Sequence, residues 1–274
     1  IKPKFWEKKT SFLSIILYPL SLIFICLIQI KKRLVKVKKF KIPIICVGNI
    51  YIGGTGKTPL SIFLANEVYS NGKKPVIIRK FYKNHFDEHN FIKEYFKNLI
   101  LEENRIDAIL KAEKNGYDCA ILDDGFQDYK INKDLNILCF NQNQLIGNGL
   151  VFPAGPLREK LVSINNAQIV VINGNKDEKF ERKVLKINKN LKVFYSKYLP
   201  VNAEEFKNKN LLAMAGIGNP GNFFQLIQQS GLKIQEKLIF PDHYEYSKSE
   251  LIKLINYAKK NYLKILTTEK DFFR

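Results

Sequence analysis

A glycine-rich segment at residues 53–58, Gly-Gly-Thr-Gly-Lys-Thr, restricts the possible folds of this chain more than any other feature. It follows the apolar run Ile42–Val47, which predicts a β-strand, and it leads into residues 58–69, which predict a helix. Glycines at such a turn allow successive backbone N–H groups to point at phosphate oxygens, and the N-terminus of the helix adds partial positive charge. The sequence therefore predicts a phosphate-binding loop (P-loop).

The P-loop motif assigns roles to single residues. The Lys57 ammonium would reach the terminal phosphates of ATP, and the Thr58 hydroxyl would bind Mg²⁺. The chain departs from the usual pattern in one respect, because Tyr51 stands where the consensus has its first glycine. The predicted nucleotide-binding residues are Gly53, Gly54, Thr55, Gly56, Lys57 and Thr58.

A second motif supplies the carboxylate that a P-loop needs at the end of a neighbouring strand. The apolar run Cys119–Leu122 is followed directly by Asp123 and Asp124. Successive side chains of a strand point to opposite faces, so one aspartate can face Mg²⁺ while the other faces a different partner. The sequence predicts a metal site of Thr58, Asp123 and Asp124, and it leaves open which aspartate binds the ion.

Apolar runs and helical stretches alternate beyond the P-loop. Further strands are predicted at Pro75–Ile78, Asp118–Leu122, Leu135–Phe140 and Ala167–Ile172, and residues 89–114 are predicted to be helical. This alternation indicates right-handed crossovers and a parallel sheet that is covered on both faces.

The C-terminal part of the chain predicts a second lobe. Residues 173–210 are rich in Lys and Asn and predict a connection, and Ser247-x-x-Glu250 forms a capping box that opens a helix ending near residue 260. Strands are predicted at Leu211–Ala215, Ile234–Phe240 and Leu263–Leu266. The predicted fold class is therefore α/β, with a P-loop parallel-sheet domain over residues 41–195 and a smaller α/β lobe over residues 196–274.

The remaining region, residues 1–40, contains an uncharged segment at residues 11–30 with basic residues on both sides. A helix of this length, with a rise of about 1.5 Å per residue, can cross a hydrocarbon layer about 30 Å thick. Pro19 and scattered polar residues also allow a helix that lies in the membrane interface, and a buried core helix is the third possibility. We expect membrane association, with the following domain on the cytoplasmic side because the denser basic cluster follows the segment.

The net charge of the chain limits the possible partners. The formal net charge of +19 suggests an anionic partner, but it arises from 39 Lys and only 6 Arg, whereas nucleic-acid binders usually rely on Arg. We therefore expect no nucleic-acid partner.

The cysteines are far apart in apolar runs, which indicates buried free thiols and neither a zinc site nor a disulfide framework. They are Cys26, Cys46, Cys119 and Cys139.

Six short motifs occur in order along the chain. They are Val47-Gly-Asn-x-x-x-Gly-Gly-Thr-Gly-Lys-Thr-Pro59, Leu122-Asp-Asp-Gly-Phe-Gln127, Phe152-Pro-Ala-Gly-Pro-Leu-Arg-Glu159, Ala215-Gly-Ile-Gly-Asn-Pro220, Phe240-Pro-Asp-His243 and Thr267-Thr-Glu-Lys-Asp271. Together they resemble the tetraacyldisaccharide 4′-kinase family, the lipid A kinases of Gram-negative bacteria. The resemblance implies two α/β lobes, a membrane-associated N-terminal helix, and a location at the cytoplasmic face of the inner membrane in contact with inner-membrane lipids.

The resemblance also implies a reaction and residues for it. An ATP- and Mg²⁺-dependent kinase of this family would phosphorylate the 4′-hydroxyl of an acylated glucosamine disaccharide 1-phosphate. By resemblance, Asp87 and His243 are catalytic and act on that hydroxyl, and Gln127 and Arg158 bind substrate. The stretch before Asp87 departs from the family pattern, since residues 79–81 read Arg-Lys-Phe in place of Arg-Gly-Tyr and the glycine before the aspartate is absent.

Three other interpretations remain open. A membrane-recruited P-loop ATPase that acts through a protein partner has a similar loop, but it usually has a lysine at the start of the loop, where this chain has Tyr51 and Ile52. The pattern Gly216-x-Gly218-x-x-Gly221 formally matches a dinucleotide-binding site. A basic module that binds anionic lipid or nucleic acid would leave the P-loop and the aspartate pair without a purpose.

Overall fold

The structure, a computed structural model, describes residues 3–82, 86–200, 202–242 and 244–273. The chain divides into two compact units. The larger unit comprises Lys2–Phe81 and Tyr95–Lys197, and the smaller unit comprises Tyr82–Glu94 and Tyr198–Arg274. Residues 82 and 86–94 are thus grouped by their contacts with the C-terminal part of the chain.

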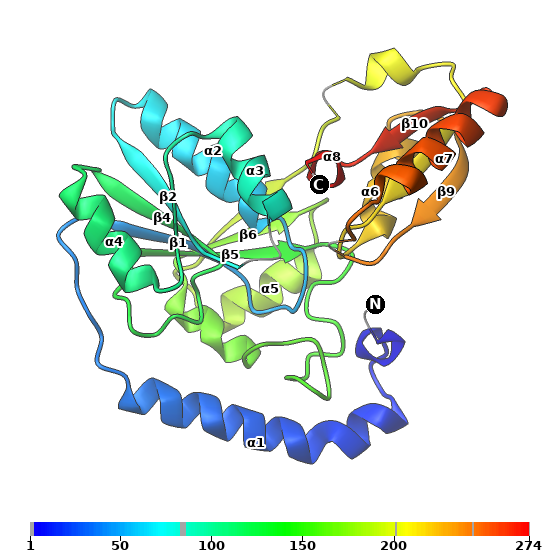
Figure 1. Cartoon of the computed structure of the whole chain (residues 1–274). Helices are drawn as coiled ribbons and strands as arrows, with labels where there is room; N and C mark the ends of the chain where they lie inside the picture. The colour runs from blue at the N-terminus through cyan, green and yellow to red at the C-terminus, as the bar shows by residue number, and fades with distance from the viewer. Residues whose placement is uncertain (1–2, 83–85, 201, 243, 274) are drawn as a thin grey trace. The chain divides into compact units, whose positions relative to one another are not determined.

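The larger unit contains a seven-stranded parallel sheet in the order β3-β2-β4-β1-β5-β6-β7, which confirms the predicted fold class. Its strands β2, β4, β1, β5 and β6 are labelled in Figure 1. The central strands are apolar and almost completely buried, as expected for strands that are covered on both faces. The strands are β1 (Ile44–Gly48), β2 (Pro75–Lys80), β3 (Leu99–Glu102), β4 (Cys119–Asp123), β5 (Leu135–Asn141), β6 (Ile169–Asn173) and β7 (Lys192–Ser196).

Helices cover both faces of this sheet. Helix α2 (Lys57–Ser70) connects β1 to β2, and α4 (Arg105–Lys114) connects β3 to β4 in the opposite direction along the sheet, so right-handed crossovers place these two helices on opposite faces. Helix α5 (Glu178–Ile187) connects β6 to β7 and packs on the 3₁₀ helix η2 (Leu161–Asn166). The carboxyl ends of the parallel strands meet at one edge, where ligands bind in open α/β sheets.

The prediction of a continuous helix over residues 89–114 is wrong. This region contains α3 (Phe86–Tyr95), the edge strand β3 and α4. A new helix starts at α4 because the Asn104 side chain accepts a hydrogen bond from the Ile106 N–H at 3.0 Å. The sequence prediction missed the break because β3 has only three apolar residues and α4 only one capping side chain. Both signals are weaker than the helical periodicity on either side of them.

The connection predicted at residues 173–210 also contains regular structure, namely α5, β7 and the 3₁₀ helix η3 (Ala203–Phe206). The N-cap residue of α5 is Asp177, whose carboxylate accepts a hydrogen bond from the Phe180 N–H at 2.9 Å, and the helix buries Phe180 and Val184. These two apolar residues are four positions apart among charged neighbours, the pattern of a surface helix with a narrow buried face. The Lys-rich composition concealed this pattern.

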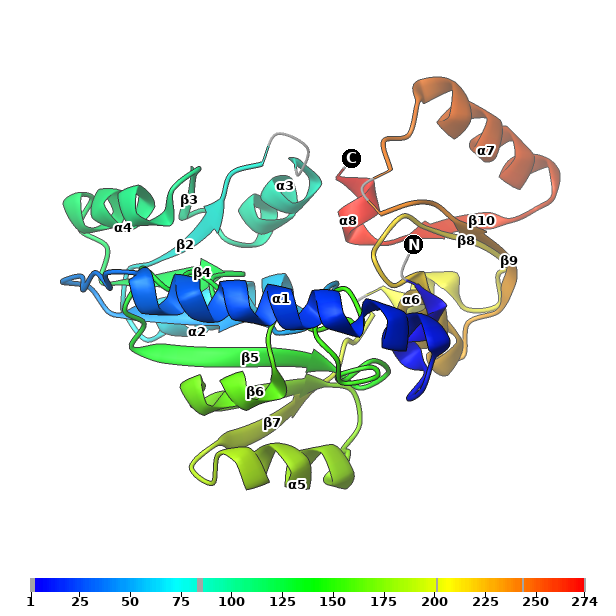
Figure 2. The same ribbon diagram turned by 90° about the horizontal axis from the view of Figure 1, so that it is seen from below.

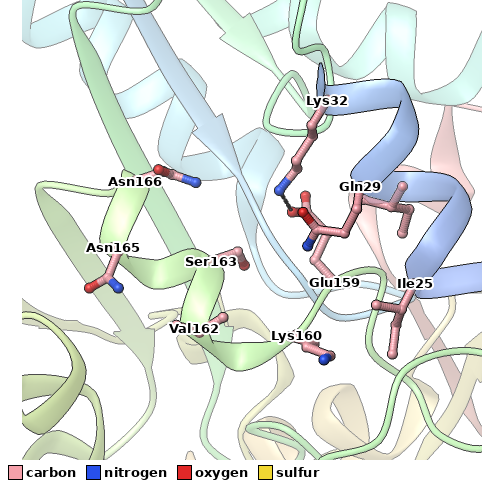
Figure 3. A pocket seen from close by; sticks show the side chains of 10 residues that line it. Ile25, Gln29, Lys32, Glu159, Lys160, Val162, Ser163, Asn165 and Asn166 are labelled. Carbon is pink, nitrogen blue, oxygen red and sulfur yellow. Dashed lines mark hydrogen bonds and ion pairs between the residues drawn. The ribbon is translucent and has the colours of Figure 1, made fainter. Parts of the chain in front are cut away.

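Helix α1 (Phe12–Leu34) follows the 3₁₀ helix η1 (Lys4–Glu7) and lies along the rest of the larger unit, to which it belongs (Figure 2). Ser21 is buried on its inner face, where Oγ donates to the Val151 carbonyl oxygen at 2.8 Å and accepts from the Ala154 N–H at 2.9 Å. Near the other end of the helix, Lys32 forms an ion pair with Glu159 beside a cavity of about 270 Å³ between α1 and η2 (Figure 3). Polar contacts therefore hold α1 against the rest of the unit between Ser21 and Lys32.

The outer face of α1 is apolar and exposed. The helix is long and apolar enough to cross a membrane by length and composition, and only 11% of its most apolar window is buried, so it is not the core helix that was considered as an alternative. Cys26 is exposed on this helix, so its predicted burial is wrong, whereas the other three cysteines are buried. The exposed large apolar residues of α1 include Phe12, Leu13, Ile15, Ile16, Leu20, Leu22, Ile23, Leu27, Ile30 and Leu34.

The smaller unit contains a parallel sheet in the order β10-β8-β9. The predicted capping box is confirmed, because Ser247 Oγ accepts from the Glu250 N–H at 3.2 Å and Glu250 Oε2 accepts from the Ser247 N–H at 2.9 Å. Helix α3 joins this unit through an ion pair between Glu88 and Lys270 at 2.9 Å. The remaining elements are β8 (Leu211–Ala215), α6 (Pro220–Gln229), β9 (Ile234–Ile239), α7 (Lys248–Lys260), β10 (Lys264–Thr267) and α8 (Glu269–Phe272).

Candidate nucleotide-binding site

The P-loop motif begins at the carboxyl end of the central strand β1. Gly48 is the last residue of this strand, and a Cβ at that position would overlap the Cβ of Phe126, so a glycine is needed for Phe126 to pack there. In the sheet register, Val47 of β1 lies opposite Asp123 of the neighbouring strand β4. The pairing of β1 with β4 therefore brings the P-loop and the aspartate pair to the same edge of the sheet.

The backbone of the loop is curled at two glycines and held by one asparagine. Gly53 (φ 129°) and Gly56 (φ 91°) adopt left-handed conformations that residues with a Cβ rarely adopt. The buried Asn49 donates from Nδ2 to the Gly53 carbonyl oxygen at 3.1 Å and to Thr55 Oγ1 at 3.0 Å. Within the residues that the structure describes, no hydrogen bond engages the N–H groups of residues 53–56, so these groups are available to phosphate oxygens.

Thr58, in the first turn of α2, is bonded to the first aspartate. Its Oγ1 donates to Asp123 Oδ2 at 3.0 Å, and Ser61 Oγ donates to Asp123 Oδ1 at 3.3 Å. Arg79, near the end of β2, donates to Thr58 Oγ1 at 3.2 Å and also to Asp123 Oδ2. Asp123 is completely buried. Its carboxylate therefore lies in a dry environment with two hydroxyl groups and one guanidinium around it.

The second aspartate has different partners. Asp124 Oδ1 lies 2.8 Å from Arg158 Nη1 and 3.6 Å from Lys57 Nζ. Burial tends to raise the pKa of Asp124, but the charges of Lys57 and Arg158 outweigh burial and hold this pKa well below its ordinary value. Burial lowers the pKa of Lys57, although the nearby Asp124 carboxylate opposes that shift. Asp124 thus remains ionised between two cations.

Gln127 and Arg158, which the resemblance assigns to substrate binding, lie in the same group of side chains. Arg158 Nη1 donates to Gln127 Oε1 at 3.2 Å, and Gln127 Nε2 donates to the Asn49 carbonyl oxygen at 2.9 Å and to Glu159 Oε1 at 3.2 Å. The Arg158 N–H also donates to the Ile50 carbonyl oxygen at 2.7 Å. The structure thus joins the first three sequence motifs into one hydrogen-bonded cluster.

Comparison with known proteins identifies the family. The family model for tetraacyldisaccharide-1-P 4′-kinase matches residues 13–95 and 87–274 of the chain. The chain belongs to this family. A tetraacyldisaccharide 4′-kinase of Pelagibacter ubique (strain HTCC1062) is 43% identical over 279 residues, which cover 100% of this chain and 88% of that protein. The tetraacyldisaccharide 4′-kinase of Francisella tularensis subsp. novicida (strain U112) is 32% identical and covers 94% of this chain and 96% of its own length.

A solved structure of the family has the same fold. The "apo" form of LpxK from Aquifex aeolicus, crystallised in complex with ATP, superposes with a TM-score of 0.72. Its sequence is 26% identical, and the match covers 96% of this chain and 90% of that one. The similarity therefore extends through both units of the chain.

Two arginines lie beside the aspartates and were not assigned from the sequence. Arg79 is buried, and Arg105 is largely buried. Arg79 belongs to the triplet that differs from the family pattern, and Arg105 lies in a polar stretch without a motif. Arg105 Nη2 donates to the carbonyl oxygens of Asp123 at 3.2 Å and of Asp124 at 2.9 Å. It thereby supports the left-handed backbone of Asp124 (φ 59°). For Arg79 a signal existed, because this arginine directly follows the apolar run Pro75–Ile78.

The structure describes the predicted catalytic residues only in part, and it describes all the predicted metal-binding residues. Asp87 lies on α3, in the smaller unit, but its side chain and the whole of His243 lie outside the described residues. In the described part of the chain, no group of three or more His, Cys, Asp or Glu side chains is arranged to hold a metal ion. The hydroxyl and carboxylate oxygens of Thr58, Asp123 and Asp124 do suit Mg²⁺, which binds few protein oxygens and completes its octahedral shell with water and phosphate oxygens.

Proposed function

We propose that this protein is an ATP-dependent lipid kinase that transfers the γ-phosphoryl group to the 4′-hydroxyl of a tetraacyldisaccharide 1-phosphate in lipid A biosynthesis. The observation that carries the proposal is the curled P-loop with Thr58 bonded to Asp123 and Lys57 beside Asp124, in a member of the tetraacyldisaccharide-1-P 4′-kinase family. Two relatives that bear the kinase name, and an LpxK crystallised with ATP, support it.

The P-loop side of the site would act through charge and position. Phosphoryl transfer needs little covalent chemistry from the protein, so most of the catalysis comes from positioning and from stabilising the charge on the phosphoryl oxygens. The N–H groups of residues 53–56 and the ammonium of Lys57 would hold the phosphates of ATP. Thr58, Asp123 and Asp124 would hold Mg²⁺, which when bound neutralises charge on the phosphate oxygens.

The acceptor side would supply a base and anion-binding groups. In the proposal, Asp87 orients His243, and His243 takes the proton of the 4′-hydroxyl, because an imidazole held by a carboxylate can accept a proton near neutral pH. Gln127 and Arg158 would bind the substrate, and the planar guanidinium of Arg158 suits a phosphate group.

We also propose that α1 lies on the cytoplasmic face of the inner membrane and does not cross it. Its inner face is bonded to the larger unit at Ser21 and Lys32, so a helix inserted across the bilayer would carry Glu159 and neighbouring polar backbone into hydrocarbon, or break these contacts. A helix lying in the interface keeps these bonds and buries only its exposed apolar side chains in lipid. That arrangement would give the site access to an acylated substrate.

The proposal is tested by transfer of label from γ-³²P-ATP to tetraacyldisaccharide 1-phosphate in detergent micelles, with and without Mg²⁺. We expect labelled lipid only when Mg²⁺ is present. The acceptor roles are tested with His243→Ala, which should slow transfer strongly while the protein still binds MgADP.

The possible results separate the alternatives. Hydrolysis of ATP without labelled lipid would support the membrane-recruited ATPase and overturn the kinase proposal. Full turnover by His243→Ala would remove that residue from the mechanism and leave the reaction itself unchanged.

A further inference from the structure

The guanidinium of Arg79 lies against two of the oxygens that the proposed metal site would use. It donates from Nη1 to Thr58 Oγ1 at 3.2 Å and to Asp123 Oδ2, and Thr58 donates to the same carboxylate oxygen at 3.0 Å. Arg79 is only 8% exposed, and its strand β2 pairs directly with β4, which ends at Asp123. One protein cation therefore bridges the hydroxyl and the carboxylate.

The contact between Arg79 and Asp123 matters because it balances a buried negative charge. A fully buried carboxylate such as that of Asp123 is costly unless a positive charge lies beside it. Arg79 supplies that charge, and Lys57 and Arg158 do the same for Asp124. Both aspartates are therefore neutralised by the protein's own cations without a metal ion.

Mg²⁺ without nucleotide competes poorly with Arg79 for the oxygens of Thr58 and Asp123. It demands octahedral oxygen coordination and loses its water reluctantly, and the described side chains around Thr58 and Asp123 offer few oxygens beyond the two that Arg79 already engages. A nucleotide changes this balance, because its phosphates supply further oxygens to the ion. They also provide acceptors for a displaced guanidinium.

We infer that Arg79 stands in for the metal ion in the nucleotide-free protein and releases the Thr58 and Asp123 oxygens when nucleotide phosphates arrive. Mg²⁺ then enters this site together with the nucleotide and not before it. The inference rests on the proposed role of Thr58 and Asp123 in binding Mg²⁺. It gives Arg79 a positioning role and places it outside the group of catalytic residues.

The test is the thermal stability of the full chain in detergent, without nucleotide, as Mg²⁺ is added. The parent protein should show no Mg²⁺-dependent rise in Tm. Arg79→Met leaves the buried Asp123 carboxylate without its cation, so Tm should fall, and Mg²⁺ alone should restore part of the loss. Its apparent affinity for Mg²⁺ without nucleotide should be at least about tenfold tighter than that of the parent, because the competing conformation is removed.

Arg105→Met is the matched control. Arg105 is also a largely buried guanidinium beside the same two aspartates, but it binds their carbonyl oxygens and not their carboxylates. Its removal should lower Tm without creating a response to Mg²⁺ alone. Arg79→Lys provides a second test that keeps the charge, and its response to Mg²⁺ should lie between those of the parent and Arg79→Met, since an ammonium lacks the guanidinium fork.

Binding of MgADP, measured by calorimetry, separates the inference from the function on which it rests. If the parent protein binds MgADP but neither Arg79 variant gains a response to Mg²⁺ alone, the inference is wrong and the proposed function stands. An equal response in the parent, or in Arg105→Met, would also overturn it. If Arg79→Met does not fold, a parent-like response of Arg79→Lys overturns the inference. Failure of the parent protein to bind MgADP would instead contradict the proposed function.

Discussion

Each unit contains one glycine-rich corner at which a parallel strand turns into a helix, and the two corners differ in what occupies the turn. In the smaller unit, between β8 and α6, the Gly216 N–H donates to both carboxylate oxygens of Asp271 at 3.1 Å, and Asp271 is buried. In the larger unit, between β1 and α2, no hydrogen bond within the described residues engages the N–H groups of residues 53–56. One corner is closed by the protein's own carboxylate, and the other is open.

This difference shows that a glycine pattern alone does not make a phosphate site. A carboxylate at the Gly216 turn occupies an N–H group that a phosphate would need, and its negative charge repels an anionic ligand. The P-loop corner instead places Lys57 in the first turn of its helix and neutralises the nearby aspartates with cations. The dinucleotide pattern Gly216-x-Gly218-x-x-Gly221 therefore belongs to a turn that is held internally, which argues against a nucleotide site there.

The largest expected effect comes from removing the cation of the open corner. Lys57→Ala should lower the rate of phosphoryl transfer by about a thousandfold, because charge on the transferred group would lose a buried positive partner. The measurement is kcat with labelled ATP at saturating lipid. Lys73→Ala, which removes an exposed lysine from the same unit, is the control and should be unchanged. A rate for Lys57→Ala within about tenfold of the parent would show that the open corner does not hold the transferred phosphate.

The second expected effect concerns the closed corner and is one of stability. Asp271→Asn replaces a carboxylate oxygen by an NH₂ group that faces donors, among them the Gly216 N–H and the Thr268 hydroxyl, which lies 2.6 Å from Oδ2. We expect a loss of about 1–3 kcal/mol in the free energy of unfolding, as for other buried groups left without a partner. Urea denaturation measures it, and Glu245→Gln, the same charge change at an exposed site, is the control. Equal midpoints for the two variants would contradict the structural role of Asp271.

The local features of both corners could be predicted from the sequence. The P-loop follows an apolar run, and the aspartate pair ends another, so their meeting at one sheet edge followed once a parallel sheet was inferred. The capping box of α7 needs only four consecutive residues, Ser247 to Glu250. Each of these predictions depends on chemistry within a few residues, which a sequence displays directly.

The contacts between distant residues could not be predicted in the same way. The bridge from Arg79 to Asp123 requires β2 to lie beside β4, and strand order is not visible in a single sequence. The Asp271 carboxylate reaches Gly216 across 55 residues, although both belong to motifs that the sequence analysis quoted. The motifs identified the family, but what closes one turn and opens the other depends on which strands are neighbours.

The smallest expected effect tests how the helices of the two units begin. The N-cap residue of α2 is Gly56, which is left-handed and offers no side-chain cap, whereas the N-cap residue of α7 is Ser247, whose hydroxyl caps the helix. An added side chain at Gly56 would be strained at φ 91°, so the open corner cannot use a cap of this kind. Ser247→Ala removes only a local cap, and it should cost about 1 kcal/mol of stability, with Ser247→Asp restoring most of it.

A second measurement tells this local role from a general packing defect. The hydrogen bond from Ser247, followed by that from Tyr244, lowers the pKa of Glu250 to about 2. Ser247→Ala should therefore move this pKa upward toward the ordinary value of a glutamate, which an NMR titration of the Glu250 carboxyl would detect. A lower unfolding midpoint with an unchanged pKa would mean that Ser247 contributes packing and not a cap. Both changes together would show that α7 starts on a hydrogen bond supplied by its own sequence.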